Sequence, residues 1–205
     1  MTTRRPPMNL GQELKQLPNL LTLSRVFMIP PVMYFMTLQT ALGNFIACII
    51  FSVAAITDWL DGWLARKRGL ESIIGKFLDP LADKLIVQAV LIMAAELGRI
   101  PAWFVVLLLS REISITGLRA IASSEGLSVD VGQAGKFKTA LQLVGLVALL
   151  LHETIRVDYL VTVVDVNFNV LGIWLLGISM FFSLGSAFSY FRGFAVAVAA
   201  RNRAD

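Results

Sequence analysis

Four aspartates with helical spacing form the part of this sequence best suited to chemistry. Asp58 and Asp61 are three positions apart, and Asp79 and Asp83 are four positions apart. On an α-helix, residues with either spacing project from one face, so each pair would present its carboxylates together. Ligation by carboxylate oxygens alone suits Mg²⁺ or Mn²⁺ better than zinc. The spacing therefore predicts a site for divalent cations.

An apolar segment of 13 residues adjoins each acidic pair. The first runs from Phe45 to Thr57, and the second runs from Leu85 to Leu97 and is broken only by Gln88 and Glu96. If the segments are antiparallel helices joined by a loop over residues 66–78, both pairs lie at the same depth. Each segment would span roughly 20 Å of a hydrocarbon core about 30 Å thick. Uncompensated carboxylates at that depth would be very costly, which again indicates bound cations.

Small residues accompany both acidic pairs. Gly62 and Ala65 lie one turn from Asp58 and Asp61, and Gly75 lies near the second pair. Small side chains leave the helix surface open, so that a ligand can reach bound metals. Taken alone, they could equally serve close packing between membrane helices. Their combination with four spaced acids favours ligand access.

The complete pattern resembles the signature of a known family, the CDP-alcohol phosphatidyltransferases. That signature, D-x2-D-G-x2-A-R-x8-G-x3-D-x3-D, is matched without departure between Asp58 and Asp83. The resemblance implies a membrane enzyme of six helices. Such an enzyme transfers a phosphatidyl group from a CDP-linked lipid to an alcohol and releases CMP.

The resemblance also implies roles for individual residues. Asp58, Asp61 and Asp79 would be ligands of two divalent cations, Mg²⁺ or Mn²⁺. Asp83 would contact metal and also act as the general base on the acceptor hydroxyl. Because no Ser, Cys or His stands beside the acids, direct transfer is simpler than a covalent intermediate. The positions expected to bind the CDP-linked lipid are Gly62, Ala65, Arg66 and Gly75.

Composition predicts one all-α, polytopic membrane domain over residues 1–205. The chain is 57% hydrophobic and 16% charged, with a mean hydropathy of +0.73, values typical of membrane proteins. Residues 1–18 are expected to form a cytoplasmic interfacial segment, with a short amphipathic helix at 9–16. Hydropathy indicates six transmembrane helices, at about residues 20–38, 44–65, 79–97, 101–121, 137–151 and 170–191.

The distribution of positive charge predicts the orientation in the membrane. If both termini share one side, all of the 18 Lys and Arg residues except Arg99 and Arg156 lie there. This asymmetry makes the acidic side cytoplasmic, and we expect an integral protein of the bacterial cytoplasmic membrane. The sequence pI of about 9.5 then reflects orientation and contact with anionic lipids. It does not indicate nucleic-acid binding, because no interleaved aromatic and basic platform is present.

A second group of candidate residues is basic. Arg111 lies ten residues beyond Pro101, or roughly 15 Å into its predicted helix, where a charge needs a partner. One interpretation is a pocket beside the metals that binds the phosphate of the acceptor, with Arg as a bidentate fork and Lys as a point charge. In the alternative, Arg111 pairs with an acid such as Glu112 while the lysines reach lipid phosphates. The residues expected to line the pocket are Arg111, Arg119, Lys136 and Lys138.

Three further segments resemble one branch of the family. They are residues 17–26, the R-E-I-x3-G-L-R stretch over 111–119 and the G-K-x-K-T stretch over 135–139. The resemblance implies CDP-diacylglycerol as donor and glycerol 3-phosphate as acceptor. CMP-forming cardiolipin synthases share some of these segments and remain an alternative, as do members that take inositol phosphate.

Two alternatives to an enzyme, a transporter and a lipid-binding scaffold, are less consistent with the sequence. A cation-coupled transporter would use the same acids, but transporters usually place their sites near the midplane and often in repeated halves. A lipid-binding scaffold explains the basic surface but not four carboxylates.

A homodimer is possible through Gly172, Gly177 and Gly185 in the last predicted span, although their spacing is a weak signal of helix pairing.

Overall fold

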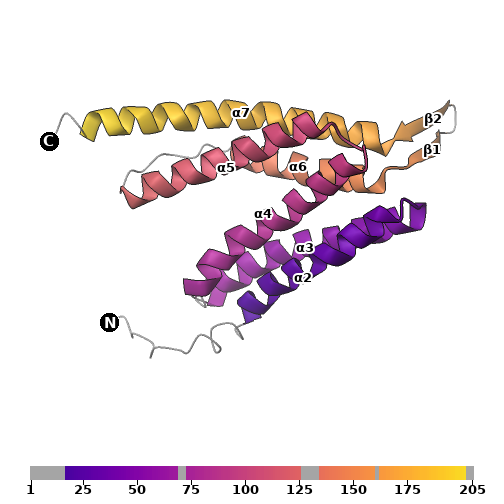
Figure 1. Ribbon diagram of the computed structural model, residues 1–205, viewed down its shortest axis with the longest axis horizontal. Coiled ribbons are helices and arrows are strands. Elements are labelled where there is room, and N and C mark those ends of the chain that lie inside the picture. The colour runs from indigo at the N-terminus through magenta and orange to yellow at the C-terminus, as the bar shows by residue number, and fades with distance from the viewer. Residues whose placement is uncertain (1–16, 69–72, 126–133, 160–161, 202–205) are drawn as a thin grey trace. The chain divides into compact units, whose positions relative to one another are not determined.

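The computed structural model describes residues 17–68, 73–125, 134–159 and 162–201 of the chain. Within these ranges the chain forms six helices and one two-stranded antiparallel sheet (Figure 1). The elements are α2 (Leu17–Thr37), α3 (Ala41–Arg68), α4 (Ile73–Glu96), α5 (Ala102–Ser124), α6 (Ala134–Leu151), β1 (Thr154–Tyr159), β2 (Thr162–Asn167) and α7 (Phe168–Arg201).

The predominantly helical fold predicted from the sequence is confirmed, and each of the six apolar segments corresponds to a helix. Two details differ. Helix α3 continues to Arg68 and α4 begins at Ile73, so the connection after the first acidic pair is shorter than the expected loop over 66–78. The prediction also missed the β1–β2 hairpin. The interfacial helix predicted at 9–16 lies outside the described residues.

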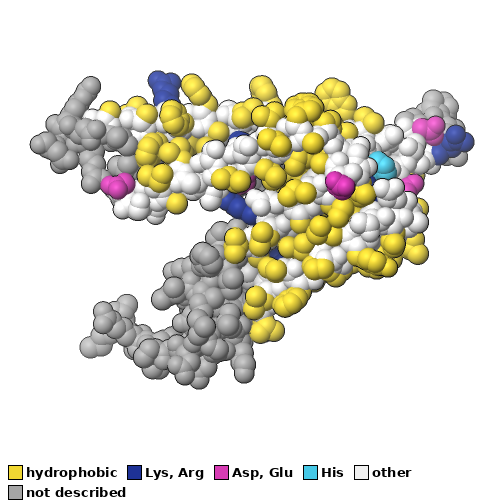
Figure 2. Space-filling model, in the orientation of Figure 1, with side chains coloured by type: hydrophobic (Ala, Val, Ile, Leu, Met, Phe, Trp, Pro, Cys, Tyr) yellow, Lys and Arg dark blue, Asp and Glu magenta, His cyan; other side chains and the backbone are white. Residues whose placement is uncertain are grey.

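One described helix is long and apolar enough to cross a membrane by itself. This segment is Phe168–Val196 of α7, with 29 residues. Ala41–Thr57 and Lys138–Leu151 are shorter apolar helices. Exposed aromatic side chains lie along α7, among them Trp174, Phe181 and Phe188, and Figure 2 shows hydrophobic side chains over its visible side. These features agree with a lipid-facing helix, while the remaining predicted spans stay predictions.

The chain divides into two compact units, residues 1–93 and 94–205. In the first unit α2 and α3 pack along each other. A Cβ atom added at Gly43 would lie 2.7 Å from the Phe35 carbonyl oxygen, so only glycine permits this approach. The hydroxyl of Thr40 accepts a hydrogen bond from the Gly43 amide at 3.1 Å and caps the start of α3. The prediction of a single membrane domain stays a prediction.

In the second unit, α6 and α7 pack most closely, at a pair of glycines. A Cβ atom at Gly172 would lie 2.8 Å from both the Gly145 carbonyl oxygen and the Leu149 amide nitrogen. Small residues at a helix crossing allow the two backbones to approach. Buried Leu146 and Leu176 fill the core nearby. Gly172 therefore serves packing inside the chain, whereas the predicted homodimer is not tested.

A buried arginine fixes the connection between α4 and α5. Arg99 donates a hydrogen bond to the Leu150 carbonyl oxygen at 3.1 Å, near the end of α6. Burial lowers the pKa of the Arg99 guanidinium, and attraction to Glu153 partly raises it again. The bond joins the segment between α4 and α5 to the last turn of α6.

The β1–β2 hairpin leads directly into α7. Its strands pair in register from Thr154 opposite Asn167 to Tyr159 opposite Thr162, and Arg156 Nε lies 3.1 Å from Asp165 Oδ1. The side-chain oxygen of Asn167 accepts a hydrogen bond from the Val170 amide at 3.0 Å. This bond supplies an acceptor for one of the free amides at the start of α7.

Candidate active site

The structure places the acidic pairs on two helices. Asp58 and Asp61 belong to α3, and Asp79 and Asp83 belong to α4. The helical backbone that the predicted pairing requires is therefore present in both segments. The four side chains lie outside the described part of the structure, so their grouping around metals stays a prediction. The same holds for the predicted lipid-binding residues, of which Gly62, Ala65 and Arg66 lie on α3 and Gly75 lies on α4.

The apolar segments next to the acids form continuous helix. Thr57, which directly precedes Asp58, turns its hydroxyl back to donate to the Ala54 carbonyl oxygen at 2.8 Å. This local bond satisfies the hydroxyl within an apolar helix. Ala54 on α3 and Ala82 on α4 are both buried. A small buried residue thus lies within about one turn of an acid in each helix.

Two of the four predicted basic residues are brought together by α5 and α6. Arg111 on α5 forms an ion pair with Glu112, and the Lys138 ammonium on α6 lies 3.5 Å from the same Glu112 carboxylate oxygen. The side chains of Arg111 and Lys138 are only 9% and 13% exposed, against 31% for Glu112. We call Arg111, Glu112 and Lys138 the α5–α6 ion cluster.

This cluster combines features of both interpretations of the basic residues. Arg111 does pair with Glu112, as the alternative proposed. Lys138, however, reaches the same carboxylate instead of extending away from the protein, so two cations converge on one anion. From the sequence, Glu112 is expected only as a partner of Arg111. Its second contact depends on the tertiary structure that brings Lys138 of α6 to Glu112 of α5, which no spacing within a single helix can reveal.

The Arg111 guanidinium retains an unused donor. Its Nε atom is buried and has no hydrogen-bond partner among the described residues. Buried polar groups are almost always hydrogen-bonded, so such a donor needs an explanation. A guanidinium presents five N–H donors in a fork that matches carboxylate and phosphate oxygens. The Arg111 donor is therefore of the kind that oxyanions bind.

The other two predicted basic residues are Arg119, whose side chain the structure describes, and Lys136, whose side chain it does not. Arg119 lies over the ring of Tyr190 on α7, with its guanidinium carbon 5.6 Å from the ring centroid, a cation–π geometry. It is also close enough to act electrostatically on Arg111 and Lys138. Lys136 belongs to α6, but its side chain lies outside the described part. Nothing in the sequence pattern pointed to Tyr190.

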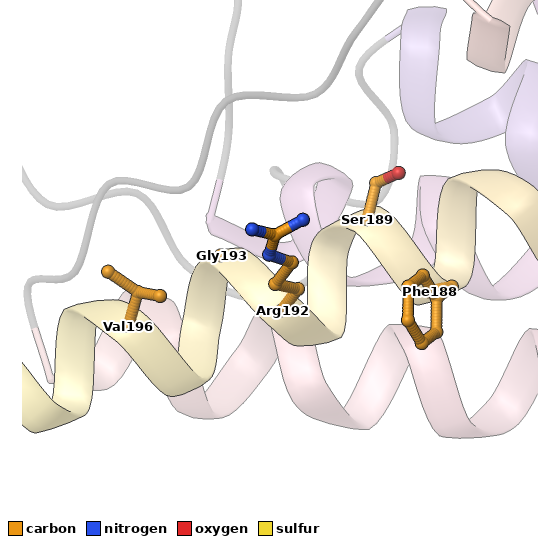
Figure 3. Close-up of a pocket in the computed structure, with 5 residues that line it drawn as sticks. All are labelled: Phe188, Ser189, Arg192, Gly193 and Val196. Atoms are coloured by element: carbon orange, nitrogen blue, oxygen red, sulfur yellow. The ribbon is translucent and has the colours of Figure 1, made fainter.

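An open groove lies on α7 beyond Tyr190. It has a volume of about 380 Å³ and is lined by Phe188, Ser189, Arg192, Gly193 and Val196. In Figure 3 the Ser189 hydroxyl and the Arg192 guanidinium project to the same side of the helix, and the Phe188 ring projects elsewhere. The groove thus places one cation and one hydroxyl among apolar side chains.

Comparison with known proteins identifies the class to which the chain belongs. Residues 15–185 match the sequence model of the CDP-alcohol phosphatidyltransferase family. The chain therefore belongs to this family.

Three similar proteins from bacteria share one name within this family. The chain is 37% identical to a protein of Bacillus subtilis (strain 168) over 187 residues, which cover 85% of this chain and 93% of the relative. It is 33% identical to a protein of Rickettsia typhi over 87% of this chain and 97% of that one. It is 40% identical to a protein of Escherichia coli (strain K12) over 70% of this chain and 81% of that one. All three relatives are named CDP-diacylglycerol–glycerol-3-phosphate 3-phosphatidyltransferase.

Proposed function

We propose that this chain transfers the phosphatidyl group of CDP-diacylglycerol to glycerol 3-phosphate, producing phosphatidylglycerophosphate and CMP. Relatives that carry this name match most of the chain. The observation that carries the choice of acceptor is the α5–α6 ion cluster, where two nearly buried cations converge and the Arg111 Nε donor has no partner among the residues that the structure describes. A cluster of cations of this kind suits a phosphorylated alcohol better than a neutral one.

The donor set fits the metals that this chemistry needs. The family generally uses divalent metal ions. Asp58, Asp61, Asp79 and Asp83 offer only carboxylate oxygens on helical backbone, which suits Mg²⁺ or Mn²⁺. When bound, two such ions would neutralise the diphosphate of the donor and polarise the phosphorus under attack.

The residues of the chain would then perform three tasks. Asp83 accepts the proton of the acceptor hydroxyl as the general base. The hydroxyl oxygen forms a bond to the phosphorus that carries diacylglycerol, while the bond from that phosphorus to CMP breaks. Gly62, Ala65 and Gly75 leave room for the CDP-linked lipid, and Arg66 supplies it with a positive charge.

The acceptor phosphate would be held by the basic residues. Arg111 offers a planar fork of donors and Lys138 a point charge, so together they fix a tetrahedral anion by both geometry and charge. Arg119 and Lys136 add positive charge to the same end of α5 and α6. With the phosphate anchored, the free hydroxyl is limited to a few orientations, which lowers the entropic cost of attack.

The reaction would take place in the bacterial cytoplasmic membrane, with the acidic pairs on the cytoplasmic side. The apolar segment Phe168–Val196 supports membrane insertion, and the excess of Lys and Arg on one side supports the orientation. The same charges would contact anionic membrane lipids.

Acceptor specificity is the direct test. The purified full chain in detergent, with CDP-diacylglycerol and Mg²⁺, is offered glycerol 3-phosphate, glycerol, serine, inositol phosphate or phosphatidylglycerol. We expect rapid CMP release with glycerol 3-phosphate alone. Equal CMP release with phosphatidylglycerol would indicate a cardiolipin synthase, and equal release with inositol phosphate would indicate a family member that uses that acceptor. No release with any alcohol would favour a transporter or a scaffold.

A further inference from the structure

The α5–α6 ion cluster poses an electrostatic problem that Glu112 solves. Arg111 and Lys138 are nearly buried, and a buried cation without a counter-charge is strongly unfavourable. A site built from such cations to bind phosphate therefore needs an anion when phosphate is absent. The Glu112 carboxylate supplies this anion, because it contacts both cations.

Glu112 is a weaker occupant than a phosphate would be. A carboxylate carries one negative charge and two oxygens, whereas a phosphate monoester carries up to two charges and three terminal oxygens. The Arg111 Nε donor, buried and without a partner among the described residues, shows that Glu112 leaves part of the guanidinium unused. Glu112 is also more exposed than either cation, so its carboxylate has access to solvent when another anion takes its place.

We propose that Glu112 is a displaceable counter-ion of the acceptor site, which competes with the acceptor phosphate for Arg111 and Lys138. This inference rests on the proposed function of the basic residues as the acceptor phosphate site. A neutral alcohol brings no charge to replace the carboxylate, and a monoanion gains little by exchange. Only a dianion gains from displacing it, so Glu112 makes the site selective for phosphorylated ligands.

The test uses Glu112→Gln, which keeps the shape of the side chain and removes its charge. Thermal unfolding of the purified full chain is followed while inorganic phosphate or sodium acetate is titrated at constant ionic strength. We expect Glu112→Gln to be less stable than the wild type without phosphate. We expect phosphate to stabilise the Glu112→Gln variant at a concentration roughly 5- to 150-fold lower than the concentration that stabilises the wild type, the usual range for coupled binding events. Acetate should stabilise only the variant.

Asp165→Asn is the matched control. It also removes one acidic charge from an ion pair, but that pair, with Arg156, lies on the β1–β2 hairpin. Its phosphate titration should equal that of the wild type. If Glu112→Gln binds phosphate more weakly than the wild type, or equally, Glu112 orients the cations and does not compete, and the proposal is wrong.

A poorly folding variant would still be informative. If Glu112→Gln can be purified only with phosphate present, the cations require an anion, as proposed. If it fails under both conditions, Glu112→Asp takes its place, because the shorter carboxylate holds the cations less well and should also strengthen phosphate binding. Unchanged or weaker phosphate binding by Glu112→Asp would overturn the inference. Phosphate binding needs no turnover, so this result is separate from whether the wild type uses glycerol 3-phosphate.

Discussion

The Ser179 hydroxyl on α7 donates a hydrogen bond to the Lys138 carbonyl oxygen on α6 at 2.9 Å. The bond attaches α7 to the turn of α6 from which the Lys138 ammonium reaches the Glu112 carboxylate. The long apolar helix is therefore connected to the candidate phosphate site by a direct contact. Packing between α6 and α7 should influence the position of Lys138.

The glycine contact between α6 and α7 gives a stability prediction. Gly172→Ala would place a methyl group 2.8 Å from backbone atoms of Gly145 and Leu149, so the helices must move apart. Overpacking of this kind costs about 1–3 kcal/mol, and the melting temperature in detergent should fall. Gly177→Ala on the same helix meets nothing within 4 Å and should melt at or slightly above the wild-type temperature. Equal melting of the two variants would contradict the close packing.

Arg119 should affect the acceptor and not the donor. Arg119→Gln removes a cation that acts on both Arg111 and Lys138 and that the proposal assigns to the acceptor phosphate. A hydrogen bond to a charged group contributes about 1.5–3 kcal/mol, so the KM for glycerol 3-phosphate should rise roughly 10- to 150-fold. The KM for CDP-diacylglycerol should stay nearly constant. Equal increases in both constants would indicate general damage to the fold.

Asp83 should control turnover. Asp83→Asn keeps the shape of the side chain and one oxygen but removes the proton acceptor. The kcat for CMP release should fall by roughly 100-fold or more, while binding of CDP-diacylglycerol partly survives. Rapid-quench measurement of the first turnover separates chemistry from product release. Wild-type kcat in this variant would show that another group takes the proton.

Metal removal should abolish the reaction reversibly. The donor set of Asp58, Asp61, Asp79 and Asp83 contains only carboxylate oxygens, so EDTA should stop CMP release and Mg²⁺ or Mn²⁺ should restore it. Zinc should restore less, because this set lacks the nitrogen and sulfur ligands that zinc prefers. Full activity in a metal-free buffer would contradict the proposed role of the acids.

The helices were predictable because each arises from a long apolar segment. The hairpin was also visible in principle, because β-branched residues alternate with polar ones between Thr154 and Asn167, a pattern typical of strands. Each strand has only six residues and the hairpin lies between the apolar helices α6 and α7, so hydropathy alone gives it little weight.

The contacts between helices could not be predicted from the sequence. Gly145 and Gly172 meet although they are far apart in the chain and lack the G-x3-G spacing of a helix-pairing motif. Glu112 and Lys138 lie on different helices, α5 and α6, and meet only in the folded chain. Residue types and spacing within one segment thus identify the charged groups, whereas the partner of each group depends on tertiary packing.

Following the glycerol carbons into the lipid product tests the central claim most directly. Wild-type protein is incubated with CDP-diacylglycerol, Mg²⁺ and ¹³C-labelled glycerol 3-phosphate, and the lipids are analysed by mass spectrometry. The account predicts a labelled lipid that retains both the transferred phosphate and the phosphate of the acceptor, formed in equal amount to CMP. CMP release without this labelled lipid would contradict it.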